Sequence, residues 1–248
     1  MKIKKTKEKP ILARARKPAE LASRSRFKVI LETVRGRWKT VAAVAGAAFL
    51  VGAAIGGYSW YRHDREVRAA KAYATVQKNV RERVEAEVKK AGESGRVDDK
   101  KIAGIAEDEL RNMIERYPDT STGLAATYEL ASLCFEQGDY KEARALFATV
   151  EAKTKGLEKT LAAKGVADCD RALNDKARAL AEYRELYDQE PDGFPGVAIG
   201  MDLAELYVAA GKPEEAKKIY RRIVEYDALS AYAGDAAREL ALLENVTP

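Results

Sequence analysis

The distribution of charged and apolar residues divides the chain into three stretches. Residues 41–61 form a run, VAAVAGAAFLVGAAIGGYSWY, that contains no charged side chain. At a rise of about 1.5 Å per residue, a helix of this length can cross a hydrocarbon layer of roughly 30 Å. The run therefore predicts a single transmembrane helix between a head, residues 1–40, and a body, residues 62–248.

The head is strongly basic, whereas the body is acidic. Residues 1–40 carry 14 Lys and Arg against three acidic residues, and residues 62–248 carry 30 Lys and Arg against 36 acidic residues. Basic flanks of a membrane helix stay on the cytoplasmic side. We therefore expect a cytoplasmic N-terminal tail and a body that lies outside the cytoplasm.

Within the basic tail, apolar residues recur at helical spacing from Phe27 through Leu31 and Val34 to Trp38. This pattern predicts an amphipathic helix that contacts anionic lipid. The same basic charges would suit a ribosome or another nucleic acid, because neutralising phosphates needs only Lys and Arg. A positive-inside flank explains the charges without any ligand, and we favour that interpretation over both lipid contact and nucleic-acid binding.

Small residues form a stripe along the predicted span. Ala48, Gly52 and Gly56 lie four residues apart and share one helix face, where a second helix can approach closely. Either the stripe packs against another membrane helix, or the small residues are merely tolerated. A signal peptide has a shorter apolar core, of about 7–15 residues. We expect the span to be retained, although cleavage near Ala54-Ile55-Gly56 stays an open alternative.

The body predicts an all-α fold. No segment alternates β-branched and polar residues, and turn signals recur at residues 117–119, 137–139, 190–192 and 210–212. No proline occurs between Pro18 and Pro118, so the span should continue as one helix. Residues 62–97 are predicted to form a juxtamembrane helix and linker, and residues 98–248 a repeat domain.

The repeat domain shows the same pattern of small and large residues at intervals of 36 and 37 residues. Each copy has two small residues followed by one aromatic residue: Ala131, Ala143 and Phe147, then Ala167, Ala179 and Tyr183, then Ala204, Ala216 and Tyr220. Small residues let paired helices approach, and an aromatic ring fills the space to the next pair. Gly138 and Gly211 supply left-handed turns, whereas Asn174 stands at that place in the middle copy. Such pairs must stack to bury both faces.

These repeats resemble the tetratricopeptide repeat family over roughly residues 98–245. The best copy carries Leu130, Ala131, Gly138, Tyr140, Ala143 and Phe147, and an incomplete copy ending in Ala106, Leu110, Met113 and Pro118 precedes it. The resemblance implies an α-solenoid of helix pairs after the transmembrane helix. The layout of basic tail, span, Tyr73-containing helix and degenerate repeats is similar to that of YfgM-type ancillary subunits of the bacterial Sec translocon.

That similarity implies a protein of the bacterial inner membrane, with a cytoplasmic N-terminus and a periplasmic repeat domain. It implies an adaptor that assists protein translocation or recruits a periplasmic chaperone, with translocon subunits or a membrane-anchored chaperone as partners. Scaffolds for envelope or outer-membrane assembly or for cell division share the layout and remain the alternative. No Cys follows the apolar run, so no lipid-attachment site is predicted.

A tetratricopeptide stack usually binds its partner in a groove lined by the first helix of each pair. The repeat register places these residues there: Tyr128, Ser132, Phe135 and Glu136, then Lys164, Asp168 and Arg171, then Met201, Glu205 and Val208. A groove for a peptide or a partner domain is the functional interpretation. In the alternative, Tyr128 and Phe135 simply pack between helices.

Few residue patterns in the sequence indicate a catalytic, metal-binding or nucleotide-binding site. His63 is the only histidine and has no neighbouring ligand or catalytic partner, so we expect no metal and no catalytic site. The glycines that follow Pro191 open no βα unit, which argues against a nucleotide site. Cys134 and Cys169 have apolar neighbours and are expected to be buried, with a disulfide left open. We predict a non-enzymatic protein without a cofactor.

Overall fold

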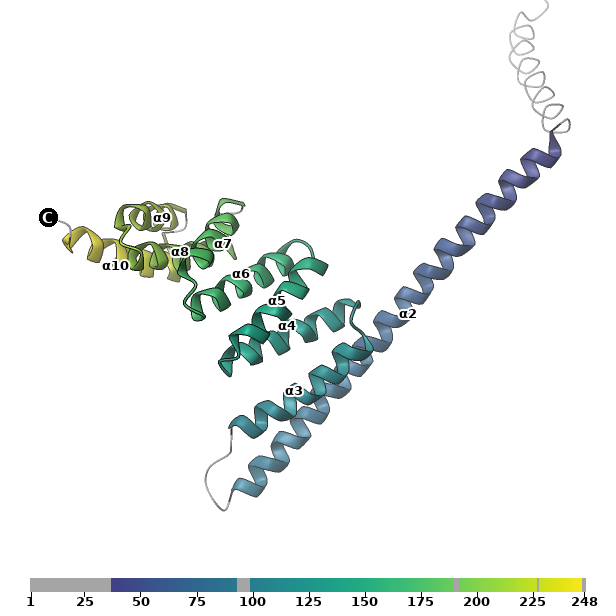
Figure 1. The fold of residues 1–248 in the computed structure, drawn as a ribbon, viewed down its shortest axis with the longest axis horizontal. Helices are drawn as coiled ribbons and strands as arrows, with labels where there is room; N and C mark the ends of the chain where they lie inside the picture. Colours follow the sequence, from purple (N-terminus) through teal and green to yellow (C-terminus); the bar gives the residue numbers. More distant parts are fainter. Residues whose placement is uncertain (1–36, 93–98, 190–191, 227, 247–248) are drawn as a thin grey trace, which may run out of the picture. The chain divides into compact units, whose positions relative to one another are not determined.

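The computed structural model describes residues 37–92, 99–189, 192–226 and 228–246. Within these ranges every regular element is a helix (Figure 1). The chain divides into two units, residues 1–62 and 63–248, and each is described by itself. The predicted basic tail and most of its amphipathic segment, residues 1–36, lie outside the described residues.

The helices follow the predicted order. Their bounds are α2 Trp38–Ala91, α3 Asp99–Arg116, α4 Ser121–Glu136, α5 Tyr140–Lys153, α6 Leu157–Ala172, α7 Lys176–Gln189, α8 Gly196–Ala209, α9 Pro213–Tyr226 and α10 Ala231–Val246. We call α4, α6 and α8 the first helices of the three full pairs, and α5, α7 and α9 the second helices. The all-α prediction is confirmed for the residues that the structure describes.

In the first unit, the described residues form the beginning of α2. Every side chain of residues 41–61 is exposed, including Phe49 at 76% and Leu50 at 70%. This helix is long and apolar enough to span a membrane. A Cβ atom placed on Gly52 or Gly56 would meet no atom within 4 Å, so these two glycines of the stripe are open to an approaching helix.

In the second unit, the remainder of α2 packs beside α3 (Figure 1). Ala69 is fully buried and shares an apolar cluster with Leu110 and Met113, two residues of the predicted incomplete repeat. Ion pairs extend the contact, with 3.4 Å between Arg83 Nη1 and Glu109 Oε1. A second pair lies further along, with 2.7 Å between Lys101 Nζ and Glu87 Oε2.

Two adjacent side chains of α2 cap neighbouring helix ends. Glu66 accepts hydrogen bonds from the Ser121 amide at 3.0 Å and the Ser121 hydroxyl at 2.8 Å, at the beginning of α4. Arg65 Nη2 donates to the Arg116 carbonyl at 3.3 Å, at the end of α3. A carboxylate at a helix N-terminus and a guanidinium at a C-terminus both oppose the charge of the helix dipole. Residues far apart in the sequence thus join α2 to the repeats.

Replacing Glu66 with alanine should lower the free energy of unfolding by about 0.5–2 kcal/mol, because the first amide of α4 loses its acceptor. Urea unfolding of the full chain in detergent measures this loss. Glu85 is exposed on the same helix, so Glu85→Ala is the matched control and should change stability by less than about 0.5 kcal/mol. Equal losses in the two variants would contradict the capping role.

The three full pairs share one turn geometry. Gly138, Asn174 and Gly211 have φ values of 87°, 63° and 72°. In each turn the next amide donates to a carbonyl five residues back: Asp139 to Cys134 at 2.9 Å, Asp175 to Asp170 at 2.9 Å, and Lys212 to Tyr207 at 2.8 Å. The left-handed turns predicted at the two glycines are confirmed. Asn174 adopts the same conformation, which asparagine tolerates better than most residues.

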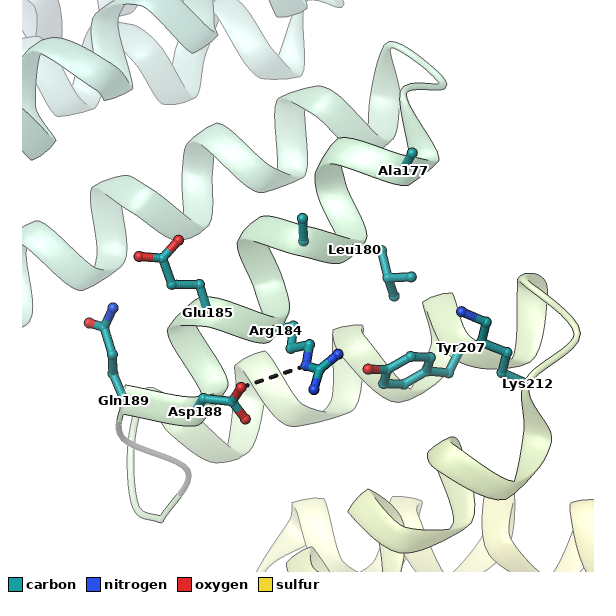
Figure 2. Close-up of a pocket in the computed structure, with 9 residues that line it drawn as sticks. Ala177, Leu180, Arg184, Glu185, Asp188, Gln189, Tyr207 and Lys212 are labelled. Atoms are coloured by element: carbon teal, nitrogen blue, oxygen red, sulfur yellow. Dashed lines mark ion pairs between the residues drawn. The ribbon is translucent and has the colours of Figure 1, made fainter.

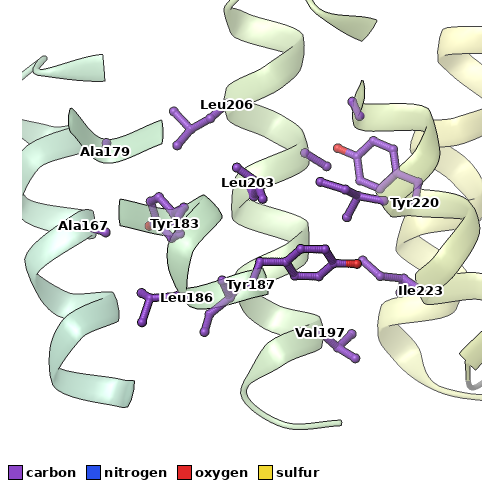
Figure 3. Close-up of a cluster of buried hydrophobic side chains, with 14 of the residues drawn as sticks. Ala167, Ala179, Tyr183, Leu186, Tyr187, Val197, Leu203, Leu206, Tyr220 and Ile223 are labelled. Atoms are coloured by element: carbon purple, nitrogen blue, oxygen red, sulfur yellow. The ribbon is translucent and has the colours of Figure 1, made fainter. Parts of the chain in front are cut away.

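The predicted core positions are buried. All six small residues are fully buried, and the three aromatic residues are at most 4% exposed: Ala131, Ala143, Ala167, Ala179, Ala204 and Ala216, with Phe147, Tyr183 and Tyr220. A large cluster joins α6 to α10, and in it Tyr187 extends across α8 toward Ile223 of α9 (Figure 3). The Tyr187 ring packs directly against the backbone of α8 at Gly200, where an added Cβ would lie 2.8 Å from the ring.

Both cysteines are free thiols in the core. Burial raises the pKa of Cys134 to about 11 and that of Cys169 to about 12. Each thiol therefore stays protonated near neutral pH, and a protonated thiol is a poor nucleophile and metal ligand. The prediction that these residues are small core side chains is confirmed.

Candidate functional site

Four of the predicted groove residues meet in a charged cluster between two first helices. Lys164, Asp168 and Arg171 of α6 join Glu205 and a further acid, Asp202, on α8; we call these five the α6–α8 network. Lys164 Nζ lies 3.1 Å from Asp168 Oδ2 and 2.8 Å from Asp202 Oδ2. Arg171 Nη1 lies 3.1 Å from Asp202 Oδ1 and 3.8 Å from Glu205 Oε2. The network therefore links consecutive helix pairs.

The electrostatics of the network keep its cations charged. Burial alone would lower the pKa of Lys164, but Asp168 and Asp202 outweigh that effect and raise it. Burial also opposes the charge of Arg171, whereas Tyr183, Asp202 and Asp168 raise its pKa. Burial, followed by the charge of Asp202, raises the pKa of Glu205. The two cations consequently stay ionised and hold the α8 carboxylates in place near neutral pH.

Tyr183 of α7 packs against the buried side of the network. Its hydroxyl donates to Asp168, and its ring lies under both cations, with 5.7 Å from Lys164 Nζ and 5.8 Å from the Arg171 guanidinium carbon to the ring centroid. Burial, reinforced by the charges of Asp168 and Asp202, raises the pKa of this hydroxyl, so Tyr183 stays neutral. The core residue predicted from the repeat thus also orients charges on the predicted face.

Sequence reasoning missed Asp202 and the polar role of Tyr183. One signal for Asp202 was present, because it is one of only two charged residues in the otherwise apolar α8 sequence. A carboxylate flanked by Met201 and Leu203 needs a partner when its helix is packed. Which helix supplies that partner depends on how the pairs stack, and the periodicity of α8 does not contain this information.

The aromatic residues of the first repeat pack between helices. The Tyr128 ring contacts the Phe147 ring edge-on, with centroids 5.2 Å apart, and Phe135 contacts Tyr140 in the same manner at 5.2 Å. These contacts agree with the alternative interpretation of Tyr128 and Phe135. Ser132 donates to the Tyr128 carbonyl of its own helix at 3.1 Å, so its hydroxyl is engaged locally.

The remaining predicted residues differ in exposure. Met201 is half-buried and packs against the large core cluster. Glu136 and Val208 are exposed near the ends of α4 and α8, and the Glu205 side chain is 61% exposed at the edge of the network. The face of the first helices therefore combines a fixed charged centre with an exposed carboxylate and an exposed apolar side chain, which suits polar recognition of another protein surface.

Several depressions lie outside the α6–α8 network, and two of them differ in character. One, of about 600 Å³, is bounded by α7 together with Tyr207 and Lys212, and its charges are mixed, with Arg184 paired to Asp188 at 3.6 Å (Figure 2). The other, of about 210 Å³, lies between α4, α5 and α6 and has mostly apolar walls that include Tyr128. No predicted residue besides Tyr128 lines either depression.

Solved structures with the same fold are distant in sequence. A tetratricopeptide repeat protein from Parabacteroides merdae is 18% identical, with a TM-score of 0.52; the match covers 71% of this chain and 61% of that protein. BtubC from P. vanneervenii is 12% identical, with a TM-score of 0.50, and the match covers 71% of this chain and 83% of that protein. No curated protein sequence matches the chain.

The family comparison covers most of the molecule. A family model described as "Tetratricopeptide repeat-like domain" matches residues 35–238. The match begins before the apolar run and includes α2, whereas the sequence resemblance began only near residue 98. This fold is a protein–protein interaction module and typically a scaffold without catalytic activity. The chain belongs to the tetratricopeptide repeat-like domain family.

Proposed function

We propose that this protein is a membrane-anchored adaptor whose repeat domain binds protein partners outside the cytoplasm. Its apolar run anchors it in a bacterial inner membrane with the basic tail in the cytoplasm. The repeat domain assists protein translocation at the Sec translocon, by contacting translocon subunits or a membrane-anchored periplasmic chaperone.

The observation that carries this proposal is the exposure of the entire apolar run. Side chains such as Phe49, Leu50 and Ile55 are more than half exposed, although the second unit buries its own core well. An uncovered apolar surface of this length is stable in lipid and unfavourable in water. The 14 basic residues before the run support the proposed orientation, because basic flanks stay in the cytoplasm.

The α6–α8 network supports the proposed binding face. Its central ion pairs, from Lys164 and Arg171 to Asp202, link α6 to α8 beneath the exposed edge of the face. Glu205 and Val208 lie at the exposed edge, where a partner can reach them without disturbing the core. A face of this kind suits an extended segment or a domain with complementary charges.

The first experiment tests the orientation. Alkaline phosphatase, which is active only outside the cytoplasm, is fused after Pro248 in cells that express the full chain. We expect high phosphatase activity, and a membrane pellet that keeps the protein after an alkaline carbonate wash. Phosphatase that is inactive although the fusion is membrane-bound would reverse the orientation, and release by carbonate would contradict the anchor.

The second experiment identifies the partner with photoreactive residues in cells. Gly52 probes the small-residue stripe, and Ala54 is its control because it lies about 200° around the helix. Val208 probes the face of the first helices, and Lys218 on α9 is its control. Adducts with a translocon subunit or its chaperone at the two probe positions, and not at the controls, would support the proposal. An envelope-assembly or division protein at Val208 would favour the scaffold alternative.

A further inference from the structure

A second charged cluster lies between α5, α6 and α7. Asp170 of α6 is only 2% exposed, and Glu182 of α7 is half-buried beside it. Arg144 Nε of α5 donates to Asp170 Oδ1 at 2.7 Å, and Arg144 Nη2 donates to Glu182 Oε1 at 3.4 Å. One guanidinium thus holds one oxygen of each carboxyl group, and the cluster joins the α4–α5 pair to the α6–α7 pair.

The other oxygen of each carboxyl group has no hydrogen-bond donor. Asp170 Oδ2 and Glu182 Oε2 are both buried and both lack a hydrogen bond. The remaining cation, Arg178, is half-exposed, and its Nε lies 3.5 Å from Asp170 Oδ2 and 3.7 Å from Glu182 Oε1, too far for a strong hydrogen bond. Two buried carboxylate oxygens without a donor are costly, and the cost grows when they belong to neighbouring groups of like charge.

We propose that Asp170 and Glu182 share one proton near neutral pH. Loss of this proton in mildly alkaline solution then weakens the packing of the α4–α5 pair against the α6–α7 pair. The shared proton supplies the missing donor: a protonated Glu182 donates through its Oε2 to Asp170 Oδ2. Deprotonation leaves two buried carboxylates that repel each other, with only Arg144 bonded to both.

The charged groups around the pair favour this assignment. Burial, then the adjacent carboxyl group of Asp170, raise the pKa of Glu182 to about 7, against the opposing effect of Arg144 and Arg178. The polar pocket that Glu182 lines also contains Glu151 of α5, Lys159 of α6 and Glu185 of α7, so two acids and one base lie nearby. Cys169 of α6 stays a neutral thiol because burial raises its pKa.

Asp170 and Glu182 lie on α6 and α7, and the same two helices carry residues of the α6–α8 network and its supporting tyrosine. Asp168 and Asp170 lie two residues apart on α6, and their partners Tyr183 and Glu182 are adjacent on α7. A shift of α7 against α6 would therefore move the hydroxyl that orients Asp168. Under this proposal, pH changes the geometry of the α6–α8 network as well as the packing between the α4–α5 and α6–α7 pairs.

The direction of the pH effect follows from linkage. Because the pKa of Glu182 is higher in the folded chain than its ordinary value of 4.5, the folded chain binds the proton more tightly than the unfolded chain. The stabilisation is complete below the unfolded pKa and is lost as pH rises through the folded pKa. Between pH 6 and pH 8 this one group should raise the unfolding equilibrium constant about tenfold.

The test compares the wild type with Glu182→Gln, which keeps the shape and the donor of the protonated acid at every pH. Full-length protein in detergent is unfolded with urea at pH 6, 7 and 8 at constant ionic strength. The unfolding constant of the wild type should rise about tenfold more than that of E182Q across this range. Glu225→Gln, an exposed change on α9 outside this charged cluster, is the control and should follow the wild type.

Hydrogen exchange provides a second readout that does not require global unfolding. After correction for intrinsic rates, α6 and α7 of the wild type should lose protection between pH 6 and pH 8, whereas the same two helices of E182Q should not. If the wild type and E182Q show the same pH dependence in both measurements, the shared proton is excluded. If E182Q fails to fold, Asp170→Asn serves as the second variant, with the same expectations.

Discussion

Replacing Gly123 with alanine should destabilise the second unit by more than about 4 kcal/mol, a loss that is exceptional for one added methyl group. A Cβ at this position in the first turn of α4 would lie 1.8 Å from the Tyr117 carbonyl oxygen. That oxygen belongs to the backbone and accepts bonds from the Thr120 amide and hydroxyl, so it cannot rotate away as a side chain would. The turn between α3 and α4 must therefore open.

Urea unfolding of the full chain, followed by far-UV circular dichroism, measures this effect. Gly234→Ala is the matched control, because a Cβ there meets nothing within 4 Å on the exposed side of α10. The control should gain about 0.5–1 kcal/mol, since alanine favours helix more than glycine does. Gly165→Ala should fall between the two, because its Cβ would lie 2.7 Å from the Phe147 ring, a side chain that can shift. Similar stabilities for all three variants would show that the turn tolerates a side chain.

Replacing Tyr183 with alanine should cost about 3–5 kcal/mol of unfolding free energy. The side chain is fully buried, so its removal leaves a cavity between α6, α7 and α8. It also removes the hydroxyl donor to Asp168 and the aromatic ring beneath Lys164 and Arg171. Both the apolar core and the α6–α8 network depend on this residue.

Two further variants separate these contributions. Tyr183→Phe keeps the ring and loses only the hydroxyl, so it should cost about 1–3 kcal/mol. Tyr232→Ala removes a tyrosine that is 41% exposed on α10 and should cost less than about 1 kcal/mol. Chemical denaturation of the four proteins under one set of conditions gives the comparison. A loss in Tyr183→Phe as large as that in Tyr183→Ala would mean that the hydroxyl, and not the ring, stabilises this region.

Several features of the protein followed from sequence alone, because they depend on local periodicity. The lack of strand-like alternation and the recurring turn signals predicted the helices of the body. The repeated small and aromatic residues predicted which side chains are buried, from Ala131 to Tyr220. Gly138 and Gly211 marked left-handed turns because their conformation is set by a few neighbouring residues. The length and composition of residues 41–61 were sufficient to identify the one described helix that is apolar enough to span a membrane.

Only the tertiary structure decided which polar groups meet. The Glu66 cap on α4 joins residues 55 apart, and Lys164 finds Asp202 on the next first helix. The contact of Asp170 with Glu182 likewise depends on how α6 lies against α7. The helical period predicts which face of its helix a residue occupies. The angle and offset between stacked pairs determine which side chain on the next helix it contacts. Apolar burial tolerates small changes in that stacking, whereas hydrogen bonds and ion pairs do not, so the core was predictable from sequence and the charged network was not.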